Sequence, residues 1–97
     1  MAEPSLYLGI DVGTGSARAA LFDRDGARLG MGVEPIQIFR PEEDFVEQSS
    51  EDIWRACGVA TRRALTEAGV GAETVAGIGF DGTCSLVVLD AVRRPVT

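Results

Sequence analysis

Short apolar runs separated by turn residues open the chain. Apolar side chains fill residues 6–10 and again 19–22, with a short polar turn between them. Runs of this length are typical of strands, and so short a connection predicts a β-hairpin. The pair Asp25-Gly26 then predicts a second tight turn, into a third strand over residues 28–39.

The spacing of apolar residues along the chain then changes. After residue 49, apolar side chains recur at three- and four-residue steps, which predicts an amphipathic helix over residues 49–69. Ser49 is a suitable N-cap, Asp52 lies where a capping-box variant needs it, and Gly69 supplies the stop. Trp54 lies on the apolar side of this helix and is predicted to be a core residue rather than a platform on which a sugar stacks. Arg55, Arg62 and Arg63 are predicted to face water. The predicted apolar residues are Ile53, Trp54, Cys57, Ala60, Ala64, Leu65 and Ala68.

The remaining segments complete one α/β unit. Pro35 is expected to confine the third strand to a sheet edge or to end its pairing early. Residues 75–80 form the next strand, which lies parallel to an earlier one because a helix makes the crossover. Residues 81–85 are then an exposed bend before a short return strand at 86–89, and the predicted order is β-β-β-α-β.

An acidic connection, residues 41–48, precedes the helix. Its carboxylates could be taken for a metal site or an acid/base pair. Acidic runs of this kind are more often solvent-exposed loops, and we assign these residues no chemical role. These carboxylates are Glu42, Glu43, Asp44 and Glu47.

The first hairpin carries the most specific chemistry. Asp11 ends its first strand, and Gly13 and Gly15 in the turn can take positive φ, so that backbone N–H groups converge on an anion. Hydroxyls and one cation complete the turn, and an aspartate is a suitable ligand for Mg²⁺. The candidate phosphate-binding residues are Asp11, Gly13, Thr14, Gly15, Ser16 and Arg18, with Asp11 also the candidate metal ligand; the alternative is a tight turn without a ligand.

Two better-known phosphate loops do not fit. A GxxxxGK[ST] loop needs a lysine, and all nine basic residues are arginine. A Rossmann GxGxxG loop needs a third glycine where Arg18 stands, and a helix where an apolar strand follows.

Composition narrows the partners. The net charge is −6, the sequence pI is about 4.5, and the arginines are scattered, which disfavours nucleic acid. No apolar run is long enough to span a bilayer and no secretory signal is present, so a cytoplasmic location is expected. Cys57 and Cys84 are far apart in a chain without histidine, and free thiols are expected.

Three segments together resemble one family. The hairpin is similar to the first phosphate motif of the actin, Hsp70 and sugar kinase superfamily, whose units are ribonuclease-H-like. Phe45-Val46-Glu47-Gln48 leading into Glu51-Asp52-Ile53-Trp54 resembles the W/F-V-E-Q/H and E-x-I-W segments of FGGY carbohydrate kinases. Residues 77–87 resemble the G-I-G-F-D-A-T-C-S-L-V run of the ribulokinase-like branch, except that Gly82 replaces alanine.

This resemblance implies a function and a set of roles. The family transfers the γ-phosphoryl group of ATP to a sugar hydroxyl, here a pentulose such as ribulose, with Mg²⁺ at Asp11 and the β- and γ-phosphates at the rest of the hairpin. The sugar side would be formed by Asp81, Thr83, Cys84 and Ser85, although Asp81 is equally suited to hydrogen bonding within its own loop. The general-base aspartate and the adenine site are expected C-terminal of Thr97, so no catalytic residue is assigned here.

Length sets further expectations. At 97 residues the chain can form part of an N-terminal kinase domain but cannot enclose a two-domain cleft, so we expect no turnover by this chain alone. We expect the full-length protein to be a homo-oligomer, and an unpaired sheet edge to favour self-association of the isolated chain. Two alternatives stay open: an actin-like or Hsp70-like nucleotide switch, and an acidic interaction module that ignores phosphate and Mg²⁺.

Overall fold

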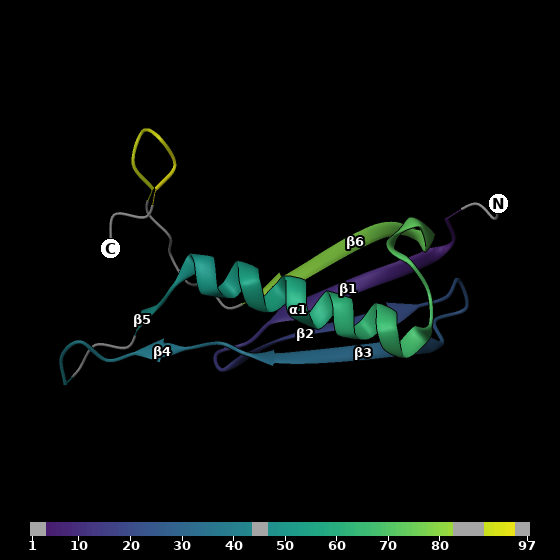
Figure 1. Cartoon of the computed structure of the whole chain (residues 1–97), viewed down its shortest axis with the longest axis horizontal. Coiled ribbons are helices and arrows are strands. Elements are labelled where there is room, and N and C mark those ends of the chain that lie inside the picture. Colours follow the sequence, from purple (N-terminus) through teal and green to yellow (C-terminus); the bar gives the residue numbers. More distant parts are fainter. Residues whose placement is uncertain (1–3, 44–46, 83–88, 95–97) are drawn as a thin grey trace.

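The protein is described from a computed structural model, in which residues 4–43, 47–82 and 89–94 are placed. The expected order of three strands, a helix and a strand is confirmed, with two short strands added before the helix (Figure 1). The elements are β1 (Leu6–Val12), β2 (Ser16–Phe22), β3 (Arg28–Pro35), β4 (Ile38–Phe39), β5 (Glu47–Gln48), α1 (Ser50–Ala68), a 3₁₀ turn (Ala72–Thr74) and β6 (Val75–Gly82).

The main sheet has the strand order β3-β2-β1-β6. Two tight turns make β1, β2 and β3 antiparallel, whereas β6 runs parallel to β1 because α1 carries the chain back to the start of the sheet. This places β6 beside β1, and the C-terminal ends of the two strands lie at the same end of the sheet (Figure 1).

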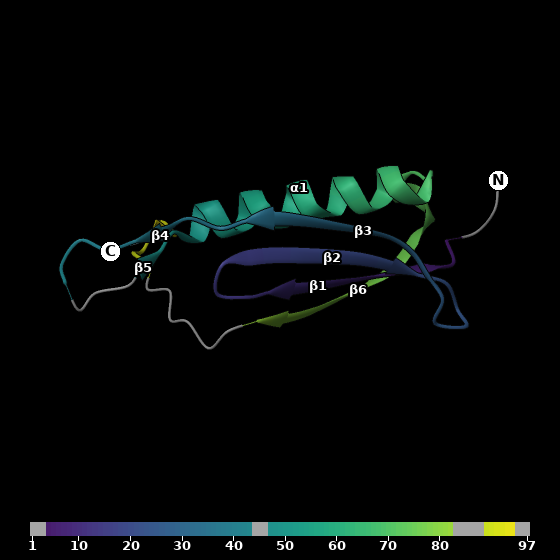
Figure 2. The same ribbon diagram turned by 90° about the horizontal axis from the view of Figure 1, so that it is seen from below.

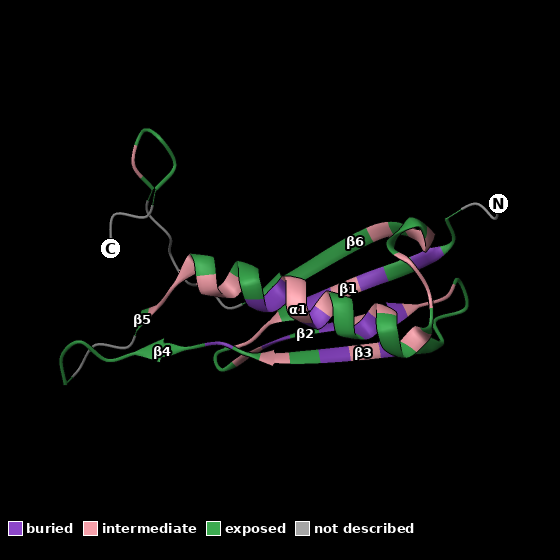
Figure 3. Cartoon of the chain, viewed as in Figure 1, coloured by how far each residue is buried: buried purple, intermediate pink, exposed green. Residues whose placement is uncertain are grey.

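α1 lies along one face of the sheet and leaves the other face uncovered (Figure 2). Alternate residues of β1 and β2 point toward the helix and, with the small side chains of α1, form the core (Figure 3). The helix packs over β3 and β2, so the helix-side residues of β6 are left open, with Ile78 59% and Phe80 62% exposed. The buried core consists of Leu6, Leu8, Ile10, Ala17, Ala19, Leu21, Ile36, Ala56, Cys57, Ala60 and Ala64.

Two glycines allow the helix to approach β3 closely. A Cβ on Gly32 would fall on the Ala60 carbonyl oxygen and 2.7 Å from the Arg63 Cβ. A Cβ on Gly30 would fall on the Ala64 carbonyl oxygen in the same way. The helix backbone therefore rests directly on the strand, and any side chain at either glycine would push the two layers apart.

Both helix ends lie where the sequence predicted them. Ser49 Oγ accepts the Asp52 N–H at 3.3 Å, and Gly69 closes the helix in the left-handed region at φ 71°. The Asp52 carboxylate does not complete a capping box: it accepts the Gln37 N–H at 2.7 Å and Arg55 Nε at 2.9 Å. The start of the helix is thus tied to the segment that follows β3.

Two predictions about local structure are wrong, those for Trp54 and for the acidic connection, and the one for Pro35 is confirmed. Trp54 is 77% exposed, because α1 turns its small residues toward β3 and leaves Trp54 off that contact. The expectation that Pro35 ends the pairing of the third strand early is confirmed, so the strand is shorter than the predicted residues 28–39. After Pro35, Ile36 N donates to the Gly15 carbonyl oxygen in the β1–β2 turn, and the chain then leaves to form β4. The acidic connection contains a strand, β5, which pairs with β4 in a separate two-stranded sheet.

Cys57 is a free, buried thiol, as expected, and burial raises its pKa. Cys84 and residues 86–88 of the predicted return strand lie outside the described residues. In the described part of the chain no helix is long and apolar enough to cross a membrane.

Candidate phosphate and sugar site

The β1–β2 hairpin places Asp11 and Arg18 side by side. They are register partners near the end of the hairpin, and both are exposed on the face that α1 leaves uncovered. Gly13 N donates to Ser16 O at 2.9 Å and closes the turn, so Thr14 and Gly15 form its tip. The structure thus brings all six predicted phosphate residues into one hairpin.

The expected positive φ of Gly13 and Gly15 is wrong. In the described chain the positive-φ glycines are Gly26 and Gly69, so neither Gly13 nor Gly15 takes that conformation. Gly13 is instead favoured because a side chain would have little room: a Cβ there would lie 3.3 Å from the Ser16 carbonyl oxygen. The loop presents its donors through ordinary extended and turn geometry.

Asp81 lies in the sheet rather than in the predicted bend. β6 continues through Gly82, and Asp81 is the direct register partner of Asp11. Asp81 Oδ1 accepts the Gly82 N–H at 3.0 Å, which is a local contact of the kind expected as its alternative role. A Cβ on Gly82 would lie 3.6 Å from Val12 Cβ, so the methyl group of an alanine would fit here without strain.

A shallow hollow of about 440 Å³ runs across the uncovered face. Gly9 of β1 and Gly79 of β6 line its middle. The carboxylates of Asp11 and Asp81 and the guanidinium of Arg18 lie at one end, near the C-terminal ends of β1 and β6. Within the described residues Arg18 forms no ion pair, so its charge is available to an anion. The residues that line this hollow are Gly9, Ile10, Asp11, Arg18, Ala20, Phe22, Gly79, Phe80 and Asp81.

Comparison with known proteins decides the family. The sequence pattern described as "FGGY family of carbohydrate kinases, N-terminal domain" matches residues 6–97. The chain belongs to the FGGY family. This membership confirms the resemblance seen in the three sequence segments.

Relatives of the FGGY chain include two proteins of similar identity. It is 49% identical to a human FGGY carbohydrate kinase domain-containing protein, over 93% of the chain and 16% of that protein. It is 47% identical to a D-ribulokinase of Saccharomyces cerevisiae, over 94% of the chain and 13% of that protein. The chain therefore spans less than a fifth of the length of either relative.

Solved FGGY-like structures agree with the fold. A xyloylose kinase from Brucella ovis superposes with a TM-score of 0.83 at 28% identity, over 93% of this chain and 19% of that one. A xylulose kinase from Rhodospirillum rubrum gives a TM-score of 0.84 at 21% identity, over 95% and 19%, and shares the fold. The predicted α/β fold with the order β-β-β-α-β, as in the N-terminal part of sugar kinase structures, is thereby confirmed.

One contact at the candidate site was not predicted from the sequence. Gln48 Nε2, on β5, donates to the carbonyl oxygen of Thr14 at the tip of the hairpin, at 2.6 Å. The residue was noticed only as part of a motif, because no periodicity or charge pattern connects positions 14 and 48. Its neighbours in sequence are an acidic loop and a helix cap, and neither indicates a contact with the phosphate loop.

Three predicted sugar-side residues, Thr83, Cys84 and Ser85, lie outside the described residues. Gly82, the last residue described before them, ends β6 as the register partner of Val12. Of the predicted sugar residues, only Asp81 can therefore be located relative to the hairpin.

Glu34, Arg55 and Arg63 form an ion-pair cluster that joins β3 to α1. Arg55 and Arg63 bind the two oxygens of Glu34 at 2.6 and 2.7 Å, and hydrogen bonding from Arg55 lowers the pKa of the Glu34 carboxyl. Among described residues no three His, Cys, Asp or Glu side chains group together as a metal site.

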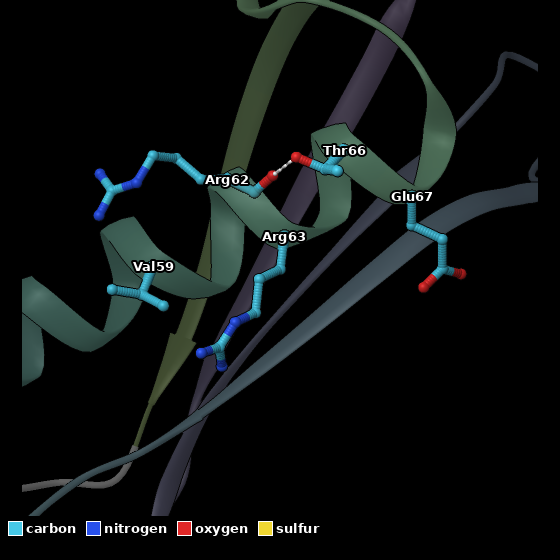
Figure 4. A pocket seen from close by; sticks show the side chains of 5 residues that line it. All are labelled: Val59, Arg62, Arg63, Thr66 and Glu67. Carbon is cyan, nitrogen blue, oxygen red and sulfur yellow. Dashed lines mark hydrogen bonds between the residues drawn. The ribbon is translucent and has the colours of Figure 1, made fainter.

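A second hollow, of about 370 Å³, lies on the outer surface of α1 (Figure 4). Its side chains all come from one helix and spread toward solvent, and Arg63 is held by Glu34 and by the Val33 carbonyl oxygen. Thr66 Oγ1 donates to the Arg62 carbonyl oxygen at 2.9 Å within the helix. We assign no function to this surface.

Proposed function

We propose that this chain forms the phosphate-binding hairpin and part of the sugar side of an ATP-dependent kinase that phosphorylates a sugar hydroxyl. The observation that carries the proposal is the position of Asp11 between Arg18 on β2 and Asp81 on β6, at one edge of an uncovered sheet face. Family membership supports the reaction class, and the D-ribulokinase relative supports a pentulose such as ribulose as the substrate.

The hairpin would bind the β- and γ-phosphates of ATP. Arg18 supplies a guanidinium for the phosphate oxygens, and Thr14 and Ser16 supply hydroxyl donors at the turn. Phosphoryl transfer depends mainly on positioning and on neutralising the charge that develops in the transition state. These side chains provide both without taking part in covalent chemistry.

The donor set also fits Mg²⁺. Asp11 presents an exposed carboxylate beside that of Asp81, and Mg²⁺ is typically held by one or two carboxylates together with substrate phosphates. When bound, the ion would neutralise phosphate charge. Asp11 would hold it, and Asp81 would orient the sugar side together with Thr83, Cys84 and Ser85.

The general base and adenine site are expected from segments C-terminal to Thr97, so we propose that this chain alone has no turnover. We also propose a cytoplasmic location and a homo-oligomeric full-length protein. The experiment is a coupled kinase assay of the full-length protein that carries this chain, run with pentuloses, pentitols, hexuloses and glycerol. Asp11→Ala is the test variant and Asp25→Ala, in the β2–β3 turn, is the matched control.

One sugar should stimulate ATP consumption by the wild type and by Asp25→Ala, with a loss of at least about 100-fold in Asp11→Ala. If ATP binds but no sugar stimulates turnover, the nucleotide-switch alternative replaces this proposal. If ATP does not bind, the hairpin is a turn without a ligand, as the interaction-module alternative requires.

A further inference from the structure

The phosphate hairpin is held from outside by two contacts on consecutive peptide groups. Gln48 Nε2 donates to the Thr14 carbonyl oxygen at 2.6 Å, and Ile36 N donates to the Gly15 carbonyl oxygen at 3.0 Å. The first donor is a side chain from β5 and the second is backbone from the segment after β3. The conformation of the tip therefore depends on residues that are distant in sequence.

Because the peptide group is planar, a contact that fixes the direction of a carbonyl group also fixes the direction of the N–H of the next residue. In a trans peptide the C=O of one residue and the N–H of the next point in opposite directions. The contact from Gln48 to Thr14 O thus directs the Gly15 N–H away from β5. Among the described residues the N–H groups of Thr14 and Gly15 make no backbone hydrogen bond, so both can donate to a ligand.

Gln48 itself is fixed on two sides. It pairs with Ile38 in the β4–β5 ladder, and the next residue, Ser49, caps α1. Asp52 in the first turn of α1 accepts the Gln37 N–H at 2.7 Å, which ties the helix start to the segment leading into β4. Because the backbone of Gln48 is already fixed, the residue loses little further conformational entropy when its side chain binds the hairpin.

We propose that Gln48 is a positioning residue, which holds the Thr14–Gly15 peptide so that the Gly15 N–H faces the β- or γ-phosphate of ATP. This inference rests on the proposed function. It requires an N–H donor at position 48, because a carboxylate oxygen there would face the Thr14 carbonyl oxygen and repel it. The residue touches neither ATP nor the sugar, and it acts through the loop.

The test is Gln48→Glu in the full-length protein, which keeps the shape of the side chain and removes the donor. The matched control is Gln37→Glu, the same chemical change at an exposed glutamine nearby. Gln48→His, which keeps a donor, is the conservative variant. Mg·ATP dissociation constants are measured by calorimetry without sugar, and the sugar KM is measured at saturating ATP.

Gln48→Glu should weaken Mg·ATP binding at least tenfold while the sugar KM stays within twofold, and Gln48→His and Gln37→Glu should stay within threefold of wild type. If Gln48→Glu does not fold, Gln48→Leu replaces it with the same expectation. Unchanged ATP affinity, or equal losses for ATP and sugar, would overturn the role of Gln48 while leaving the kinase proposal intact. Failure of the wild type to bind Mg·ATP would overturn the proposed function itself.

Discussion

Asp11 and Asp81 are direct partners in the parallel register of β1 and β6, with their side chains on the sheet face that α1 leaves open. Like charges opposite each other on one face repel, and an ordinary surface would avoid this arrangement. Two adjacent carboxylates are, however, a suitable environment for a divalent cation. We therefore expect this pairing to destabilise the fold in the absence of a cation.

The first prediction concerns this repulsion. In metal-free buffer, Asp81→Asn should raise the free energy of unfolding by about 0.2–1 kcal/mol, because one of two facing charges is removed. Asparagine Oδ1 can still accept the Gly82 N–H, so the local hydrogen bond is kept. Urea unfolding with EDTA measures the change, and Asp25→Asn is the control. A loss of stability in Asp81→Asn alone would show that the charges do not repel.

The second prediction concerns the contact between α1 and β3. Gly32→Ala should destabilise the fold by about 1–3 kcal/mol, because the new methyl group would fall on the Ala60 carbonyl oxygen. Gly79→Ala is the matched control, since a Cβ on that strand glycine meets nothing within 4 Å. Both are measured by chemical denaturation. Equal effects of the two substitutions would mean that helix–strand contact does not need Gly32.

The third prediction comes from two turns with the same hydrogen-bond pattern. In residues 23–27 and 90–94 the leading aspartate accepts from the N–H groups two and four residues later, and the fourth position is left-handed. Gly26 occupies that position in the first turn and Arg93, at φ 65°, occupies it in the second.

Because a side chain strains this conformation, Arg93→Gly should stabilise the fold by about 1 kcal/mol. Gly26→Ala should destabilise it by a similar amount. Thermal and urea unfolding of the two variants would check both signs together. A stabilising Gly26→Ala would contradict the assignment of strain to this position.

The fourth prediction is a loss of stability in acid. The N–H of Gln37 and the guanidinium of Arg55 lower the pKa of the Asp52 carboxyl, and hydrogen bonding from Arg55 lowers that of Glu34. A carboxyl whose pKa is lower in the folded state stabilises the fold above its unfolded pKa, and this stabilisation is lost as the pH falls through the folded value. Stability should therefore begin to fall below about pH 4, near the ordinary pKa values of these groups.

Asp52→Asn should flatten this acid limb, whereas Glu51→Gln, at an exposed neighbour in the same helical turn, should leave it steep. Urea titrations from pH 7 to pH 2.5 measure both. An unchanged limb in Asp52→Asn would assign the acid sensitivity to other carboxyls.

The fifth prediction concerns the free edge of the sheet. Among the described residues β6 is an outer strand of eight residues without proline, and its helix-side residues Ile78 and Phe80 are exposed. Such an edge can pair with a second strand. The isolated chain should self-associate at high concentration, and Ile78→Lys should restore the monomer in light scattering. A sharp monomer peak of the wild type would contradict this.

The sequence by itself determined the features that depend on neighbouring residues. Turn chemistry at Asp25-Gly26, the Ser49 cap and the Gly69 stop are local, because each depends on backbone geometry within a few residues. The order of the elements along the chain and the parallel direction of β6 were also predicted, since a helical crossover makes β6 parallel to an earlier strand. The β1–β2 hairpin was also predicted from its own residues.

Only the tertiary structure decided which distant residues meet. The register that sets Asp81 against Asp11, the exposure of Trp54 and the contact of Gln48 with Thr14 all depend on how close α1 comes to the sheet and how far each strand continues. That approach is set by Gly30 and Gly32 beneath the small residues of the helix. A sequence pattern records which side chains are apolar, whereas the spacing between layers depends on the packing of all of them at once.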